Sequence, residues 1–98
     1  MNFVRVRAEA ETDVGEATEW YEGQRRGLGI EFLLGLDAAV ERAALNPQAY
    51  AVQYRGARRV LLRRFPYSVY YLVDADAIEV FGVLHQQRIP AAWQSRLS

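Results

Sequence analysis

The fold of this chain is decided by the stretch ARRVLLRRFPYSVYYLVDADAIEVFGVL, residues 57–84. Its first part, Ala57–Phe65, has consecutive apolar residues at its centre, which is typical of an interior strand. Pro66 ends this run because proline cannot donate to a strand ladder. Ser68–Val73 is rich in Val and Tyr and predicts a second strand, and Ile78–Leu84 predicts a third. An Asp-Ala-Asp turn and short connections favour an antiparallel meander.

Two helical patterns precede these strands. The acidic stretch Glu9–Glu22 has an apolar stripe at spacings of four, three and four. The stripe consists of Ala10, Val14, Ala17 and Tyr21. A second helix is predicted over 28–45, with apolar residues recurring every fourth position at Leu28, Phe32, Leu36 and Val40. Asn46-Pro47 ends it, because proline disfavours helical backbone in the residue before it. The short Gly-containing link predicts an antiparallel helical hairpin.

The two ends of the chain complete the pattern. Phe3–Arg7 alternates apolar and charged residues, which predicts a short strand with one buried face. Ala91–Leu97 predicts a last helical turn anchored by Trp93. The expected order is therefore β-α-α-β-β-β. We predict an α+β fold, with an antiparallel sheet covered on one face by a helical hairpin, in one domain over residues 1–98.

Composition excludes several classes of site and protein. Cysteine is absent, so the sequence offers no disulfide, thiol nucleophile or cysteine-bound metal. There is no metal-ligand spacing and no Gly-rich phosphate loop, and we expect neither a metal nor a cofactor. No apolar run is long enough to span a membrane, and no signal peptide is visible. We therefore expect a cytoplasmic protein.

Charge is distributed unevenly although its sum is zero. Residues 1–50 carry five Arg against nine acidic residues, a net charge of −4; residues 51–98 carry seven Arg against three, a net charge of +4. Every basic residue is Arg, which recognises carboxylate or phosphate in a bidentate manner and cannot act as a general base. A net charge of zero argues against a nucleic-acid-binding protein that contacts many phosphates, so we expect nucleic acid to be involved only indirectly.

The candidate chemical residues are six arginines and the single histidine, namely Arg55, Arg58, Arg59, Arg63, Arg64, Arg88 and His85. Strand alternation predicts that Arg59 and Arg63 share one face and that Arg58 and Arg64 share the other. Several Arg with one His could cleave a phosphate ester, with guanidinium groups holding the developing charge and imidazole moving a proton. The alternative is structural: Arg at strand ends pairs with helix carboxylates, and a lone His packs at a strand end.

The aromatic residues of the helical segments suggest a binding partner. Trp20, Tyr21 and the second helix carry more aromatic and apolar surface than a small domain needs. Ordinary core packing is the competing interpretation for Tyr21 and Phe32.

Several motifs then coincide along the chain. The helices carry Ala10-x-x-Asp13, Trp20-Tyr21-Glu22, Gly27-Leu28-Gly29-x-x-Phe32-Leu33 and Asn46-Pro47. The second half carries Arg58-Arg59, Arg64-Phe65-Pro66-Tyr67-x-Val69-Tyr70-Tyr71 and His85-x-x-Arg88-x-Pro90-x-x-Trp93-x-x-Arg96. With these motifs the chain resembles the ParE branch of the RelE/ParE toxin–antitoxin superfamily, which includes plasmid stabilisation proteins.

This resemblance implies a toxin that is neutralised by a cognate ParD-like antitoxin, whose C-terminal segment folds along the hairpin and sheet. ParE-type toxins are associated with poisoning DNA gyrase by binding. The RelE branch is instead a ribosome-dependent mRNA endonuclease, with a basic cluster that commonly includes Lys and with a C-terminal Tyr or His. This chain has no Lys and no Tyr after Tyr71, and Gln86 follows His85. We therefore favour a non-catalytic gyrase inhibitor.

The resemblance also assigns residues to roles. The expected target contacts are Arg58, Arg59, Arg63, Arg64, His85, Arg88, Trp93 and Arg96. The expected antitoxin contacts are Trp20, Leu28, Phe32 and Leu36. If the chain is instead an mRNA endonuclease, its catalytic residues are His85, Arg63 and Arg88. A third interpretation is a weakly toxic or inert interaction module.

Overall fold

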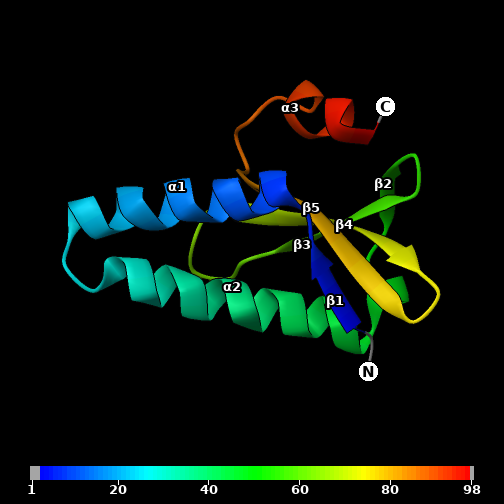
Figure 1. Ribbon diagram of the computed structural model, residues 1–98, viewed down its shortest axis with the longest axis horizontal. Helices are drawn as coiled ribbons and strands as arrows, with labels where there is room; N and C mark the ends of the chain where they lie inside the picture. Colours follow the sequence, from blue (N-terminus) through cyan, green and yellow to red (C-terminus); the bar gives the residue numbers. More distant parts are fainter. Residues whose placement is uncertain (1–2, 98) are drawn as a thin grey trace.

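A five-stranded sheet in the order β1-β5-β4-β3-β2 forms the centre of the computed structural model, which describes residues 3–97 (Figure 1). The strands are β1 (Phe3–Val6), β2 (Val52–Tyr54), β3 (Ala57–Leu61), β4 (Tyr67–Asp74) and β5 (Ala77–His85). The last three form the predicted antiparallel meander. β1 pairs with β5 in parallel, so the sheet is mixed. The α+β class is confirmed, and the expected elements occur in the expected order with one additional strand, β2; the prediction of an entirely antiparallel sheet is wrong, because β1 runs parallel to β5.

One face of this sheet is covered by α1 (Ala8–Gln24) and α2 (Leu28–Leu45), which lie side by side as the predicted hairpin (Figure 1). The bounds of α2 coincide with the prediction, because periodic burial and Asn46-Pro47 mark its two limits. α1 buries Ala10, Ala17 and Tyr21 as predicted, but its fourth buried residue is Asp13, whereas Val14 is half-buried.

The linkage between the helices depends on glycine. Gly27 has φ of 88°, a left-handed conformation that glycine adopts without strain. The Glu22 carboxylate accepts hydrogen bonds from the backbone N–H groups of Gly27 and Gly29. A Cβ added at Gly29 would lie 3.0 Å from the Thr18 carbonyl oxygen, so the absence of a side chain lets α2 approach α1 closely.

The main core lies between the hairpin and the sheet. Phe32 from α2 packs with Tyr21 from α1, their ring centroids 5.3 Å apart, and Phe65 contacts Tyr21 edge-on at 4.9 Å. The sheet supplies fully or nearly fully buried residues, among them Val60, Val69, Tyr71, Ile78 and Val80. These contacts place Tyr21 and Phe32 in the core, in agreement with the packing interpretation.

The opposite face of the sheet is covered in part by the C-terminal segment, which comprises α3 (Ala91–Gln94) and the 3-10 turn η2 (Ser95–Leu97) (Figure 1). Trp93 stacks on Tyr70 of β4 at 4.5 Å between centroids, confirming the predicted anchor. This segment adds a small second core that the predicted fold, with one covered face, did not include.

β1 corrects one expectation. All four of its residues are exposed, so the prediction of a strand with one buried face is wrong. Val4 and Val6 pair with Ile78 and Val80 and therefore face the hairpin side. β1 is one of the two edge strands, and its Val4 and Val6 side chains stay 41% and 44% exposed on the hairpin side.

A short segment between α2 and β3 was not predicted. It contains a 3-10 turn, η1 (Pro47–Ala49), followed by β2, which pairs with β3. The buried Tyr71 hydroxyl donates to the Pro47 carbonyl oxygen at 2.8 Å and fixes this segment on the sheet.

Within residues 3–97, no helix combines the length and the apolar character needed to cross a membrane.

Candidate partner and target surfaces

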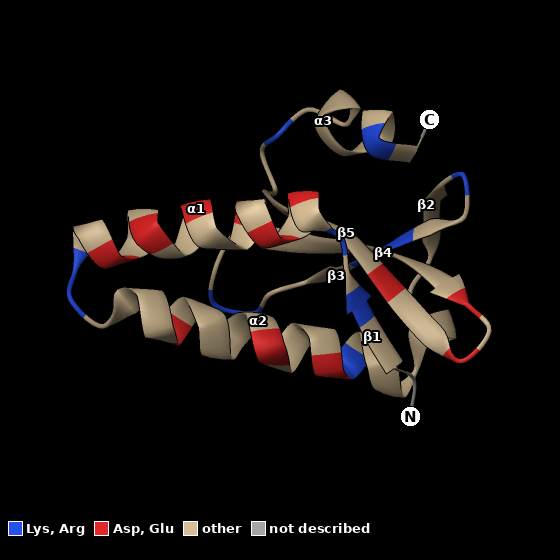
Figure 2. Cartoon of the chain, viewed as in Figure 1, with Lys and Arg blue, Asp and Glu red and all other residues tan. Residues whose placement is uncertain are grey.

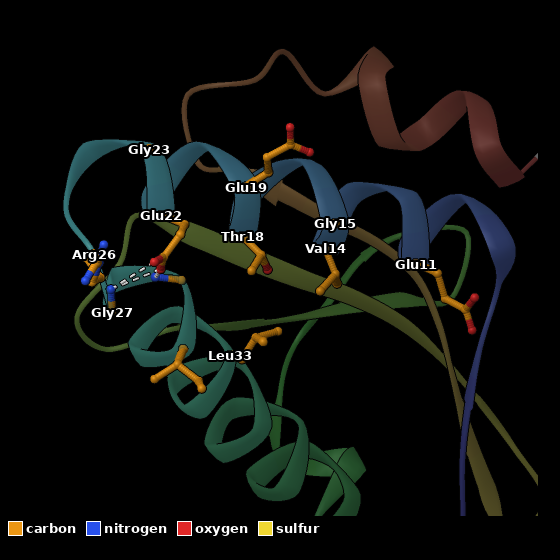
Figure 3. Close-up of a pocket in the computed structure, with 12 residues that line it drawn as sticks. Glu11, Val14, Gly15, Thr18, Glu19, Glu22, Gly23, Arg26, Gly27 and Leu33 are labelled. Carbon is orange, nitrogen blue, oxygen red and sulfur yellow. Dashed lines mark hydrogen bonds between the residues drawn. The ribbon is translucent and has the colours of Figure 1, made fainter.

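The outer side of the hairpin carries a groove of about 1070 Å³ between α1 and α2 (Figure 3). We call it the outer groove. It is lined by Glu11, Val14, Gly15, Thr18, Glu19, Glu22, Gly23, Arg26, Gly27, Gly29, Ile30 and Leu33. Val14 and Thr18 point from α1 toward α2 (Figure 3). The glycines keep the groove open, because they place backbone where other residues would place side chains.

The charge around the outer groove is asymmetric. α1 carries six acidic residues and no basic one. Asp13 and Glu22 are engaged within the fold, whereas Glu11 and Glu19 line the groove without forming an ion pair among the described residues. Figure 2 shows acidic but no basic positions along α1. Arg26 supplies positive charge at the hairpin turn. The groove therefore combines apolar side chains with a mostly acidic rim on α1.

The predicted antitoxin contacts divide into two groups. Phe32 is fully buried and Leu36 nearly so, and both face the sheet; their prediction as contact residues is wrong because the fourfold stripe of α2 is its core side. Leu28 is half-buried against the same core. Trp20 is 58% exposed but is not among the residues that line the outer groove; it lines two other pockets, one of which also contains His85 and Arg88.

The exposed apolar residues of α2 were missed by sequence reasoning. Ile30 is 64% exposed and Leu34 is 65% exposed. They form a second stripe with the same spacing of four as the core stripe, displaced by two positions. That second stripe was the available signal for a candidate partner surface, because a surface helix normally carries polar residues on the face opposite its core stripe.

His85 and Arg88 line a pocket of about 220 Å³ between α1 and the end of β5. Tyr67 and Glu16 line the same pocket, and the Tyr67 ring lies 5.4 Å from the imidazole. The Gln87 backbone N–H donates to Nδ1 of His85 at 3.1 Å, so the neutral imidazole carries its proton on Nε2. Burial raises the pKa of the Tyr67 hydroxyl. The pocket thus brings together His85 and Arg88 but not Arg63.

Two of the predicted target-contact arginines are engaged within the fold. Arg58 donates to the Tyr50 carbonyl oxygen and, at 2.8 Å, to the Gln48 side chain. Arg64 pairs at 2.9 Å with Glu31 of α2, whose pKa is lowered by Arg64 and by Arg25. The predicted shared face of Arg58 and Arg64 is wrong, because β3 ends at Leu61 and Arg64 turns toward α2.

Arg59 and Arg63, by contrast, line one pocket of about 370 Å³. Arg42 of α2 joins them and donates to the Leu61 carbonyl oxygen at 2.7 Å. We call this the basic pocket; its other lining residues are Tyr50, Gln53, Val60, Leu61 and Leu62. It is separate from the His85 pocket, and the two have no lining residue in common.

Arg96 and Trp93 hold the C-terminal segment in place. Arg96 donates to both carboxylate oxygens of Asp13, at 2.6 and 3.1 Å, and to the Phe81 carbonyl oxygen. The hydrogen bond to Asp13 raises the pKa of Arg96. Trp93 is buried against Tyr70. Neither side chain is available to a target while this segment stays folded.

Among residues 3–97 no group of His, Asp or Glu is arranged to hold a metal ion.

Comparisons with known proteins agree with this architecture. Residues 4–90 match the family model described as ParE toxin of type II toxin-antitoxin system, parDE. Toxin ParE2 of Mycobacterium tuberculosis is 29% identical over 96 residues, covering 97% of this chain and 91% of that protein. The ParDE toxin–antitoxin system of P. aeruginosa has a similar fold, with a TM-score of 0.76 at 16% identity over 87% of this chain and 96% of that one. The isolated E. coli RelE toxin has a TM-score of 0.65 at 16% identity over 97% and 95%. The chain is a member of the ParE toxin family of type II toxin–antitoxin systems.

Proposed function

We propose that this toxin inhibits DNA gyrase by binding it and that a cognate antitoxin neutralises it by occupying the outer groove. The groove, lined by the exposed Ile30 and the half-buried Val14 and Leu33, is the observation that supports the antitoxin site. Similar folds have been solved as the P. aeruginosa ParDE system and as the intact E. coli RelBE toxin-antitoxin complex, the latter with a TM-score of 0.65 at 17% identity over 90% of this chain and all of that one.

The outer groove suits an amphipathic helix. Such a helix places apolar side chains at spacings of three and four into a groove between two helices. Covering Ile30 removes an exposed side chain from water, and full burial of a residue of this kind contributes about 1.5–3 kcal/mol. Because both walls are helices of one rigid hairpin, the groove exists before the partner arrives and little ordering cost falls on the toxin.

The antitoxin site is tested by Ile30→Asp, with Leu45→Asp as the matched control. Both residues are exposed on α2, but only Ile30 lines the groove, so both variants should fold like the original chain. We expect Ile30→Asp to weaken binding of the cognate antitoxin at least about tenfold in calorimetric titration. Leu45→Asp should bind like the unmodified toxin. Equal affinities of the two variants would place the antitoxin elsewhere.

The gyrase branch is supported by how the basic residues are divided. An mRNA endonuclease would need guanidinium groups and a proton-transfer group around one phosphate. Here Arg63 and Arg59 belong to the basic pocket, and His85 belongs to another pocket. With no Lys in the chain, this division favours contact through a surface over catalysis at a single centre. The proposed contact residues are Arg59, Arg63, Arg88 and His85.

A supercoiling assay with purified DNA gyrase tests this target directly. The toxin should inhibit supercoiling, Arg59→Gln and Arg63→Gln should each reduce inhibition by a graded amount, and His85→Ala should retain most of it. A toxin that leaves supercoiling unchanged at every concentration would contradict the proposal.

The second candidate is a ribosome-dependent mRNA endonuclease, which is favoured by the joint location of His85, Arg88 and Tyr67 in one pocket. In a translation extract it predicts mRNA cleavage by the toxin and loss of cleavage in His85→Ala with the fold intact. A chain active in neither assay is an interaction module.

A further inference from the structure

The basic pocket concentrates positive charge that the fold does not use. The side chains of Arg59 and Arg63 form no hydrogen bond or ion pair with any of residues 3–97, unlike those of Arg5, Arg7, Arg64 and Arg96, which all have acidic partners. Within the described chain the lining of this pocket includes no carboxylate. Two guanidinium groups therefore line one hollow, and no carboxylate in its lining neutralises their positive charge.

The third guanidinium is held in a fixed position. Arg42 lies in the last turn of α2, and its bond to the Leu61 carbonyl oxygen fixes the side chain across the end of β3. A guanidinium has five N–H donors, so this bond leaves others for a ligand. The pocket is thus formed by a helix, a strand and the loop after the strand. A pocket built on such elements is preorganised for an anion.

The surroundings of the pocket favour a protein over a nucleic acid as the ligand. Leu61, which lines the pocket, is 44% exposed, and Val52 of the adjacent β2 is 51% exposed. Apolar side chains beside a basic hollow fit a polypeptide with acidic and aliphatic residues. An extended nucleic acid would need a long row of basic residues. This chain has zero net charge, and all the charged residues of α1 are acidic.

We propose that the basic pocket binds carboxylate side chains of an acidic, partly aliphatic polypeptide segment on the toxin's target, with Arg59 and Arg63 as the specificity-determining residues. Bidentate guanidinium–carboxylate pairing supplies the recognition. The inference rests on the proposed function in that the target is a protein, and it specifies the chemistry of the target surface.

Titration of the purified toxin with a short capped peptide of alternating glutamate and leucine, followed by NMR, tests this inference. Shift changes should concentrate at Arg42, Arg59 and Arg63. Arg59→Gln and Arg63→Gln should each weaken binding about fivefold, the change expected from losing one exposed charge pair. Arg55→Gln removes the same charge from the nearby β2–β3 turn, outside the pocket, and should leave affinity within about twofold.

Three results would overturn the inference. They are equal peptide affinity in the unmodified chain and in both pocket variants, binding of inorganic phosphate with no binding of the peptide, and displacement of the peptide by a single-stranded oligonucleotide at lower concentration. The supercoiling assay separates this inference from the proposed function. Peptide binding without gyrase inhibition leaves the pocket valid and rejects gyrase as target, whereas inhibition that survives both Arg substitutions rejects the pocket alone.

Discussion

Replacing Asp13 with Ala should destabilise the fold strongly, because this carboxylate joins three elements. The Asp13 side chain is 7% exposed and accepts three hydrogen bonds, two from Arg96 and one from the Val83 backbone N–H. Through these bonds it connects α1, β5 and the C-terminal segment. Ala removes the carboxylate, leaves the Val83 N–H without a partner and leaves the Arg96 guanidinium partly buried beside the Phe81 carbonyl alone.

The expected cost follows from burial. Breaking a buried ion pair by removing one partner costs about 3–5 kcal/mol. The Arg96 side chain is 20% exposed and can turn toward water, which favours the lower value. The higher helix propensity of Ala returns up to about 0.7 kcal/mol. We therefore expect a loss of about 2–3 kcal/mol, a large share of the roughly 5–15 kcal/mol that stabilises a domain of this kind.

Urea unfolding followed by circular dichroism measures this loss as a lower midpoint at unchanged slope. Asp74→Ala is the matched control, because Asp74 pairs with Arg5 at an exposed site. This variant should lose less than about 1 kcal/mol. Asp13→Asn should fall between the two, since its amide oxygen can still accept from Val83. If Asp13→Ala lost no more stability than Asp74→Ala, the account of how the C-terminal segment is held would be refuted.

Three further variants test the core and the close approach of the two helices. Burial raises the pKa of Tyr71 from 10.0 to about 12, so the folded state holds this proton more tightly than the unfolded state. The stability that this proton contributes is present below pH 10 and should decline as the pH rises toward 12. Tyr71→Phe should flatten this decline in unfolding experiments across that window; an equally steep decline in the variant would exclude Tyr71 as its source. Gly29→Ala brings a Cβ within 3.0 Å of the Thr18 carbonyl oxygen and should cost about 1–3 kcal/mol, whereas Gly35→Ala meets Phe65 only at 3.5 Å and should gain up to about 1 kcal/mol. Equal thermal midpoints for these two variants would contradict the close helix approach.

Local patterns predicted the elements well where one physical cause dominated. The fourfold apolar spacing of α2 reflects burial against the sheet, and Asn46-Pro47 then limits the helix, so both bounds were predictable. The strands β4 and β5 followed from their β-branched and aromatic residues. β1 shows what a pattern leaves out. Its alternation correctly gave a strand, but burial depends on whether another layer reaches the sheet edge, which no local sequence feature determines.

The candidate site was less predictable for the same reason. The stripe that contains Phe32 and Leu36 was the stronger signal on α2, and a strong apolar stripe marks the core side of a helix. The proposed partner surface includes Ile30, which belongs to the weaker stripe of Ile30 and Leu34. Arg58 and Arg64 could not be placed from alternation, because the Leu62 N–H pairs with Tyr67 and the chain turns before Pro66. Asp13 entered the sequence analysis only through the Ala10-x-x-Asp13 motif, and its structural role could not be predicted because its partner Arg96 is 83 residues away in sequence.

The central claim, that this toxin acts on DNA gyrase, is tested most directly by tightly induced expression in a bacterial host with pulse labelling of DNA and protein synthesis. We expect DNA synthesis to fall first, with filamentation and a DNA-damage response, and Arg59→Gln combined with Arg63→Gln to delay that fall. A collapse of protein synthesis before any change in DNA synthesis would contradict the claim and make His85 the leading catalytic candidate.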